Sequence, residues 1–146
     1  IVGITKAYTT RVGTGSLDTE LHDGFEQVIR DIGHEYGTTT GRARRIGWLD
    51  LDKVKEGIAL TGTTHICITH IDTIMNACKE VGYTDFSFKA NGSIVQMPIW
   101  NSVSIEDENL LNFITFVENF TSRKVAYLGT GRDRKNIIET DGVCCD

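Results

Sequence analysis

The sequence predicts an α/β fold in which a mostly parallel sheet is flanked by helices and carries one β-hairpin. Segments with helical periodicity alternate along the chain with short apolar runs rich in β-branched residues, a pattern typical of sheets covered by helices. Asn91-Gly92 joins two strand-like segments, and this dipeptide is the strongest short-range hairpin signal. The length of 146 residues favours one domain, so we expect a single α/β unit over 1–146.

Two helices are expected in the first third of the chain. Apolar residues recur at helical spacing over 18–32, with Asp18 as the expected N-cap and Gly33 as the stop. The stretch 37–45 shows no periodicity and predicts a loop. Asp50 is then expected to cap a second helix, whose apolar face carries Leu51, Val54 and Ile58.

The remaining elements follow from apolar runs and turn signals. Segment 63–69 predicts a buried strand, and a short helix is expected after it, up to Cys78. Segments 86–90 and 93–97 form the two arms of the hairpin. Segment 105–121 predicts a long helix capped by Ser104. Segment 125–128 predicts a last strand that runs into the glycine loop 129–131.

Composition excludes several classes of function. The formal net charge of −5 disfavours nucleic-acid and anionic-membrane partners. The longest apolar runs are only a few residues, far short of the roughly 20 that a membrane span requires. The four cysteines lack the spacing of a zinc site, so we expect Cys67 to be a reduced core residue and Cys144 and Cys145 to be free thiols. With no signal peptide evident, the reducing cytoplasm is the expected location.

The loop 37–45 is the first candidate binding site. Three threonines, two glycines and three arginines lie within these nine residues. Hydroxyls and glycine N–H groups suit a carboxylate or a phosphate, and an arginine fork can bind either group in a bidentate manner. The alternative is a solvated basic loop without a ligand.

The second and third candidates follow the predicted buried strands. Asp72 stands just beyond the strand 63–69, where ligands bind in open α/β sheets, and a carboxylate there can accept two N–H groups, such as guanine N1–H and its 2-amino group. The alternative is that Asp72 only caps the next helix. The glycines in residues 129–131 would let the backbone approach a ligand. The alternative is that these residues form an ordinary turn. His65 and His70 are expected to point to opposite faces of one strand, so no shared metal is predicted.

Four segments, in order, resemble the adenylosuccinate synthetase family. Residues 6–13, with Gly15 and residues 19–21, resemble K-A-Y-S/T-T-R-V-G-x-G-P-F-P-T-E-L. Residues 34–50 resemble E-F/Y-G-x-T-T-G-R-x-R-R-x-G-W-L/F-D almost residue for residue. Residues 69–72 stand where the family has T-K-L-D, and residues 129–134 where it has S-x-G-P-x-R. The resemblance is strong over residues 5–75 and loose beyond them.

The resemblance implies a ligase that joins the amino group of L-aspartate to C6 of a 6-oxopurine nucleotide. In the family, a nucleoside triphosphate, normally GTP, phosphorylates the purine O6 with Mg²⁺ present, and the aspartate nitrogen then displaces phosphate. By this resemblance Val12 contacts the ribose, and residues 38–41 (Thr38, Thr39, Thr40 and Gly41) form the aspartate loop. Arg42 serves aspartate and the monophosphate nucleotide, and Arg44 contacts the triphosphate side. The base-binding set is His70, Ile71, Asp72, Gly129, Thr130 and Gly131. A homodimer is also implied.

Departures from the family pattern bear on nucleotide choice. His70 replaces the lysine of T-K-L-D, and Gly129 replaces the serine of the last motif. We therefore expect ATP to serve beside GTP. The region after residue 72 is short, as in archaeal or phage versions, and phage relatives include 2-aminoadenylosuccinate synthetases, so the acceptor is either IMP or a guanine nucleotide (dGMP or GMP).

The resemblance also implies what these residues do not supply. Family members carry a glycine-rich phosphate loop, a catalytic aspartate and a catalytic histidine in an N-terminal half that has no equivalent here. We therefore expect the chain to be the C-terminal portion of a longer synthetase with a P-loop-NTPase-like fold, without catalytic or metal-binding residues of its own and inactive alone. The alternatives are a stand-alone nucleotide- or dicarboxylate-binding module and a structural relic of the fold.

Overall fold

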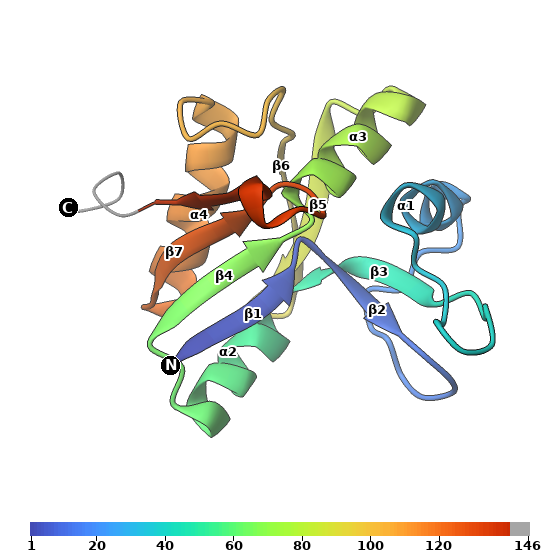
Figure 1. The fold of residues 1–146 in the computed structure, drawn as a ribbon. Helices are drawn as coiled ribbons and strands as arrows, with labels where there is room; N and C mark the ends of the chain where they lie inside the picture. The colour runs from blue at the N-terminus through green and yellow to red at the C-terminus, as the bar shows by residue number, and fades with distance from the viewer. Residues whose placement is uncertain (141–146) are drawn as a thin grey trace.

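Two four-stranded sheets organise the computed structural model, which describes residues 1–140. In the first sheet, β1 (Val2–Lys6), β4 (His65–Thr69) and β7 (Lys124–Gly129) are parallel, and β8 (Ile137–Glu139) is antiparallel to β7. The predicted parallel sheet is this one, with β4 at its centre (Figure 1).

The second sheet is mixed and has the order β2-β3-β5-β6. Its strands are β2 (Tyr8–Arg11), β3 (Arg45–Asp50), β5 (Asp85–Ala90) and β6 (Ser93–Pro98), and only β3 and β5 run parallel. The β5–β6 hairpin is confirmed, since Asn91 and Gly92 take φ values of 54° and 77°. The Asp52 carboxylate accepts both N–H groups of this turn, at 2.7 and 2.9 Å.

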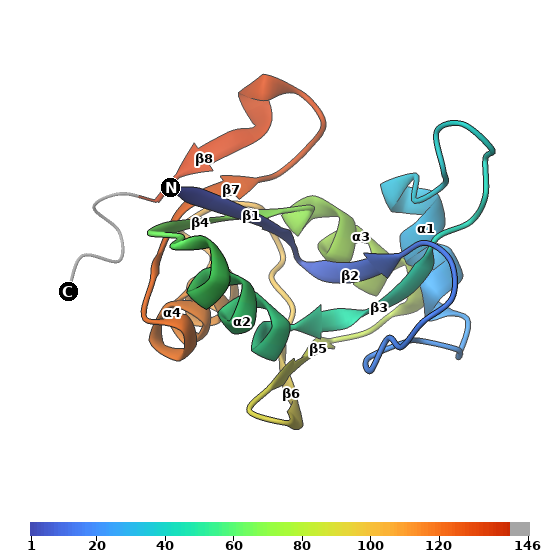
Figure 2. The same ribbon diagram turned by 90° about the horizontal axis from the view of Figure 1, so that it is seen from below.

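Four α-helices cover the sheets, and they are α1 (Phe25–Gly33), α2 (Leu51–Thr61), α3 (Ile71–Val81) and α4 (Glu108–Thr121). Helix α1 packs on α3, and α2 packs on α4 (Figure 2). A short 3₁₀ helix, η1 (Arg134–Asn136), precedes β8. Within residues 1–140, no helix combines the length and the apolar character needed to cross a membrane.

The core is rich in aromatic residues where α3 and α4 meet β5. The rings of Phe86, Phe88, Trp100 and Phe113 are all buried and pack with centroids 5.0 to 5.7 Å apart. The indole N–H of Trp100 donates to the Ile71 carbonyl at 3.0 Å, which satisfies a buried donor and ties the start of α3 to this cluster.

The expected helix over 18–32 is wrong in its first half. Helix α1 begins at Phe25 behind Gly24, and Asp18 caps nothing. Residues 19–21 instead bind β3, with Leu21 N–H donating to the Ile46 carbonyl at 2.9 Å and the Thr19 hydroxyl donating to the Trp48 carbonyl at 2.6 Å. Tertiary hydrogen bonds therefore outweigh a helical pattern that the sequence shows clearly.

Other boundaries also differ from expectation. Strands β1, β2, β3 and β8 were not predicted, and Arg45, expected in a loop, begins β3. Asp107 rather than Ser104 caps α4. His70 lies beyond β4 in the left-handed region, so it does not share a strand with His65. Cys67 is a free thiol but only partly buried. The predictions for Cys144 and Cys145 lie outside the described residues.

Candidate functional site

The predicted aspartate loop, within residues 37–45, is a closed turn between α1 and β3. A bridge between Tyr36 and Ala43 closes it, the Gly37 N–H donates to the Arg42 carbonyl at 2.7 Å, and the Gly41 N–H donates to the Gly37 carbonyl at 2.9 Å. Gly41 takes a φ of 66°, a left-handed conformation that favours glycine. The backbone thus fixes the loop shape without using most of its side chains.

The side chains of this loop face solvent. Residues 38–42 are all exposed, and the guanidinium of Arg42 makes no hydrogen bond or ion pair with any other residue of the described chain. The Thr40 hydroxyl accepts the Arg42 N–H at 3.4 Å, a long contact. The loop therefore presents hydroxyls and one unpaired guanidinium, a donor set suited to a carboxylate.

Arg44 differs from Arg42 although it lies only two residues further on. Its Nη1 lies 3.1 Å from Oε2 of Glu35, which is 2% exposed. The Arg30 Nε–H donates to the Arg44 carbonyl at 2.9 Å. Arg44 is therefore tied to the protein interior, and its predicted contact on the triphosphate side remains a prediction that this structure leaves untested.

Val12 lies on an exposed loop after β2, with a side chain 64% exposed. Arg45 holds this loop, because its Nη1–H donates to the carbonyls of Gly13 at 2.9 Å and Gly15 at 2.8 Å. The same guanidinium pairs with Glu20 at 2.6 Å, which lowers the pKa of that carboxyl. The loop around Val12 is thus anchored to β3.

The residues predicted to bind the base follow the carboxyl ends of β4 and β7 in the first sheet. Strands β4 and β7 are parallel neighbours, so Thr69 at the end of one lies beside Gly129 at the end of the other. A Cβ at Gly129 would lie 3.1 Å from Thr69 Cγ2 and 3.2 Å from its Cα. A side chain at position 129 would therefore require Thr69 to shift by a few tenths of an ångström.

The loop after β7 is built by its own hydrogen bonds. The Thr130 N–H donates to the Asn136 carbonyl at 2.6 Å, and its hydroxyl donates to the same oxygen at 3.0 Å. A Cβ at Gly131 would lie 2.6 Å from the Asn136 amide oxygen, so a side chain here would displace that of Asn136. The loop keeps one shape beside the end of β4.

Residues 70–72 have three different environments. His70 is the N-cap position of α3, with a φ of 61° and no side-chain capping bond. The Ile71 side chain is fully buried, so only its backbone could contact a ligand. Asp72 lies in the first turn and accepts no capping bond, so its expected alternative role as a cap is not seen. The Asp72 side chain is half-buried, and its predicted role in base binding stays a prediction.

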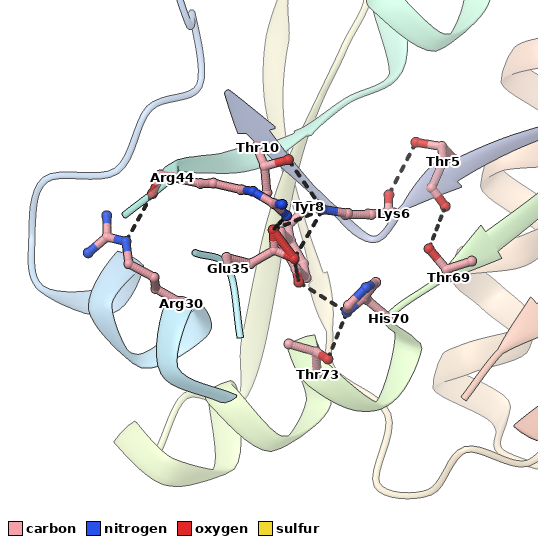
Figure 3. A network of polar contacts seen from close by, with 10 residues as sticks. All are labelled: Thr5, Lys6, Tyr8, Thr10, Arg30, Glu35, Arg44, Thr69, His70 and Thr73. Atoms are coloured by element: carbon pink, nitrogen blue, oxygen red, sulfur yellow. Dashed lines mark hydrogen bonds and ion pairs between the residues drawn. The ribbon is translucent and has the colours of Figure 1, made fainter. Parts of the chain in front are cut away.

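A polar network that sequence reasoning missed joins these two regions (Figure 3). At its centre the Glu35 carboxylate accepts Lys6 Nζ at 2.9 and 3.0 Å, Arg44 at 3.1 Å and the Tyr8 hydroxyl at 3.2 Å. Lys6, Tyr8 and Glu35 all stand inside the motifs quoted above, but nothing in their spacing indicated that they meet. Gly33 makes room, since a Cβ there would lie 2.6 Å from the Tyr8 hydroxyl.

The network controls the ionisation of its members. Burial opposes ionisation of Glu35, but the hydrogen bonds and charges of Lys6 and Arg44 outweigh it and lower its pKa. Burial and the neighbouring Glu35 carboxylate raise the pKa of Tyr8, so the phenol stays protonated. Burial, together with the charge of Lys6, lowers the pKa of His70. At neutral pH the network therefore holds an anionic Glu35 and a neutral His70.

A cavity of about 790 Å³ lies between β1, β2 and α2, and Lys6 and Tyr8 of the network line part of its wall. It contains none of the predicted site residues, and its wall includes residues 1–6 of the edge strand, where Ile4 is 75% exposed. Strand β1 is an edge strand of the first sheet (Figure 2). In residues 1–140, no three His, Cys, Asp or Glu side chains converge as metal ligands.

Comparisons with known sequences agree on one family. The family model "Adenylosuccinate synthetase" matches residues 1–106. Adenylosuccinate synthetases are 36% identical over 170 residues in Clostridium botulinum and 38% identical over 162 residues in Caldicellulosiruptor saccharolyticus. These alignments cover 97% and 94% of this chain but only 39% and 38% of the relatives, so the chain spans about two fifths of their length.

Solved structures agree on the fold. The fully ligated adenylosuccinate synthetase of Plasmodium falciparum is 27% identical, covers 94% of this chain and superposes with a TM-score of 0.82 over 39% of its own length. The cyanophage S-2L succinoaminodeoxyadenylate synthetase, solved with dGMP and dATP, is 19% identical, with a TM-score of 0.56 and coverage of 95% and 33%. The predicted α/β synthetase fold is confirmed.

Proposed function

Because the chain belongs to the adenylosuccinate synthetase family, we propose that it supplies the aspartate loop and the triphosphate base site of a purine-nucleotide ligase. The ligase joins the aspartate nitrogen to C6 of a 6-oxopurine nucleotide. A triphosphate donor transfers its γ-phosphoryl group to O6, and the C6–O6 bond then breaks as the C6–N bond forms, with release of phosphate. Mg²⁺ would neutralise charge on the transferring phosphoryl group.

One observation carries the aspartate assignment. The loop 37–42 has a fixed backbone, yet the Arg42 guanidinium beside its three threonines has no partner within residues 1–140. A loop whose only role is to turn the chain has no need of a rigid frame around unpaired donors. A dicarboxylic amino acid offers the acceptors that this donor set lacks, and a bidentate arginine contact would also orient it.

The base site is proposed at the carboxyl edge of β4 and β7. Asp72 can accept guanine N1–H and its 2-amino group, whereas adenine offers an acceptor at N1. His70 and Gly129 remove the lysine and the serine that the family has here, so discrimination against adenine weakens while Asp72 is retained. We propose that the complete enzyme accepts ATP or dATP as well as GTP. The acceptor nucleotide is IMP or a guanine nucleotide.

Donor choice tests this site directly. In the complete enzyme, kcat/KM for GTP should exceed that for ATP by less than the roughly 10⁴-fold of a fully hydrogen-bonded site. His70→Lys should move the ratio toward GTP, and His65→Lys, at the exposed histidine that begins β4, is the matched control. Rejection of ATP by more than about 10⁴-fold contradicts the relaxed site. An unmoved ratio in His70→Lys shows that His70 does not lie at the base.

A further inference from the structure

Glu35 and His70 are connected through one phenol (Figure 3). The Tyr8 hydroxyl lies 3.2 Å from Glu35 Oε1 and 3.1 Å from His70 Nδ1. The two rings are held edge to face, with centroids 5.4 Å apart and planes at 73°. The same nitrogen of His70 lies 3.1 Å from the Thr73 hydroxyl. The positions of the protons in this chain of contacts can be assigned by starting from Glu35, whose protonation state is fixed by its other partners.

That end is Glu35. Lys6 contacts both of its oxygens and Arg44 contacts one, so the carboxylate is ionised, and an ionised carboxylate only accepts hydrogen bonds. The Tyr8 hydroxyl must therefore donate its single proton to Glu35. With that proton used, the phenol oxygen can only accept from His70.

His70 Nδ1 must then carry a proton. A bare Nδ1 would place its lone pair against a lone pair of the Tyr8 oxygen at 3.1 Å. The Thr73 hydroxyl could donate to a bare Nδ1, but the conflict between that nitrogen and the Tyr8 oxygen would remain. With a proton on Nδ1, the Thr73 hydroxyl accepts the same N–H or donates elsewhere. A neutral imidazole with a proton on Nδ1 has none on Nε2. Figure 3 shows the second ring nitrogen on the side of the ring away from the Tyr8 hydroxyl.

We propose that Glu35 and Tyr8 are positioning residues that hold neutral His70 in the Nδ1–H tautomer, so that Nε2 offers a hydrogen-bond acceptor to the base of the triphosphate. The part of this inference that concerns the nucleotide rests on the proposed function, whereas the tautomer does not. The family lysine at this position would present a donor and a positive charge. Here the network turns the same position into a neutral acceptor.

This reversal favours a base that presents an N–H group to His70. A 6-amino purine offers such a donor, whereas the 6-oxo group of guanine or hypoxanthine offers another acceptor. ATP and purine ribonucleoside triphosphate differ only in the 6-amino group, so this pair isolates the contact. The expected preference for ATP is about tenfold, the value of one hydrogen bond of ordinary strength.

The tautomer is measured by ¹⁵N NMR of the histidine rings in the full chain at pH 7.5. The expected spectrum shows a protonated Nδ1 and an unprotonated Nε2 for His70, assigned by its loss in His70→Asn. A protonated Nε2 with a bare Nδ1 overturns the proposal, whatever the chain does with nucleotides.

Two variants test the route of control. In Glu35→Gln, the amide N–H₂ can donate to the Tyr8 oxygen, which frees the phenol proton for His70 and should move the ring toward the Nε2–H tautomer. Tyr8→Phe removes the hydroxyl but keeps the ring, and the Nδ1–H preference should fall. Tyr83→Phe, at a tyrosine packed on Phe25 away from His70, is the matched control and should leave the spectrum unchanged. An Nδ1–H tautomer that persists in both variants contradicts the route.

The nucleotide part is tested separately, by equilibrium binding of the two triphosphates to the complete enzyme. The wild-type enzyme should bind ATP about tenfold more tightly than purine ribonucleoside triphosphate, and Tyr8→Phe should reduce this ratio toward one. An equal affinity in the wild type, with the expected tautomer measured, overturns the contact with the base. Binding of neither triphosphate contradicts the proposed function itself.

Discussion

At the scale of single residues, two arginines that are near neighbours in the sequence have different environments. Arg42 is exposed and without a partner in the described chain, whereas Arg44 is committed to the buried Glu35. Sequence patterns grouped them with the same loop because both follow the threonines. Only the structure separates the exposed arginine from the arginine that pairs with a buried carboxylate.

Arg42→Leu in the complete enzyme should reduce kcat/KM for aspartate by the equivalent of about 2–5 kcal/mol, the cost of losing one partner of a substrate charge pair. The KM for the triphosphate should change little. Arg123→Leu, which removes a guanidinium bound to the Thr63 carbonyl, is the control for a general loss of charge. Unchanged aspartate kinetics in Arg42→Leu would mean that the loop is only a solvated turn.

Glu35 makes a prediction about pH. Its pKa is lowered in the folded chain, so its contribution to stability is complete above the unfolded carboxyl pKa and is lost as the pH falls through the lower folded value. Glu35→Gln should reduce the free energy of unfolding at pH 7 by about 2–3 kcal/mol, as for a hydrogen-bonded charged group. The difference in the free energy of unfolding between wild type and Glu35→Gln should become smaller below about pH 4.

Denaturant unfolding at several pH values measures this gap, with the exposed Glu139→Gln as the control. His70 also makes the folded state less stable at lower pH, but over a higher pH range than Glu35. Its pKa is lowered on folding, so protonation of His70 destabilises the folded state as the pH drops below about 6.5. A gap for Glu35→Gln that is constant from pH 7 to pH 3 would contradict the ionised carboxylate at the centre of the network.

At the scale of elements, the sequence predicted the helix α2 and the hairpin well because their signals are local. Asp50 caps α2 by accepting the Lys53 N–H at 3.2 Å, and Asn91-Gly92 needs only its own backbone conformation. Strands β1, β2 and β3 were missed because they owe their pairing to partners far away in the sequence. The predicted start of α1 at residue 18 is wrong for the same reason, because residues 19–21 are hydrogen-bonded to β3.

The cap of α4 shows how a local signal can also mislead. Both Ser104 and Asp107 are good N-cap residues, but only the Asp107 carboxylate accepts the N–H groups of Asn109 and Leu110. It also accepts those of Asn101 and Ser102 in the preceding loop. Burial opposes its ionisation, yet these four hydrogen bonds lower its pKa.

Asp107→Ala should therefore destabilise the chain by about 2 kcal/mol, the upper end for a lost cap. Ser104→Ala should cost less than about 0.5 kcal/mol, because the Ser104 hydroxyl accepts only the exposed Glu106 N–H. The difference in chemical denaturation midpoint between these two variants measures the prediction. Equal losses of stability in the two variants would contradict the assignment of Asp107 as the cap of α4.

At the scale of the whole molecule, the candidate site depends on contacts between distant segments. The resemblance predicts which motif residues bind aspartate and the base, and the sheet places Thr69 beside Gly129. The network of Lys6, Tyr8 and Glu35 could not be foreseen, because burial of a charge depends on the fold around it. The open edge of β1, with Ile4 exposed, is likewise visible only in three dimensions.

The measurement that tests the central claim most directly compares the chain alone with a fusion. The chain would replace the matching 37% of the Thermotoga maritima adenylosuccinate synthetase, which is 36% identical to it over 149 residues. We expect aspartate- and triphosphate-dependent formation of adenylosuccinate or 2-aminoadenylosuccinate by the fusion, its loss in the Arg42→Leu fusion, and no rate for the chain alone. A measurable rate for the chain alone, or a cooperatively folded fusion that binds neither aspartate nor triphosphate, would contradict the account.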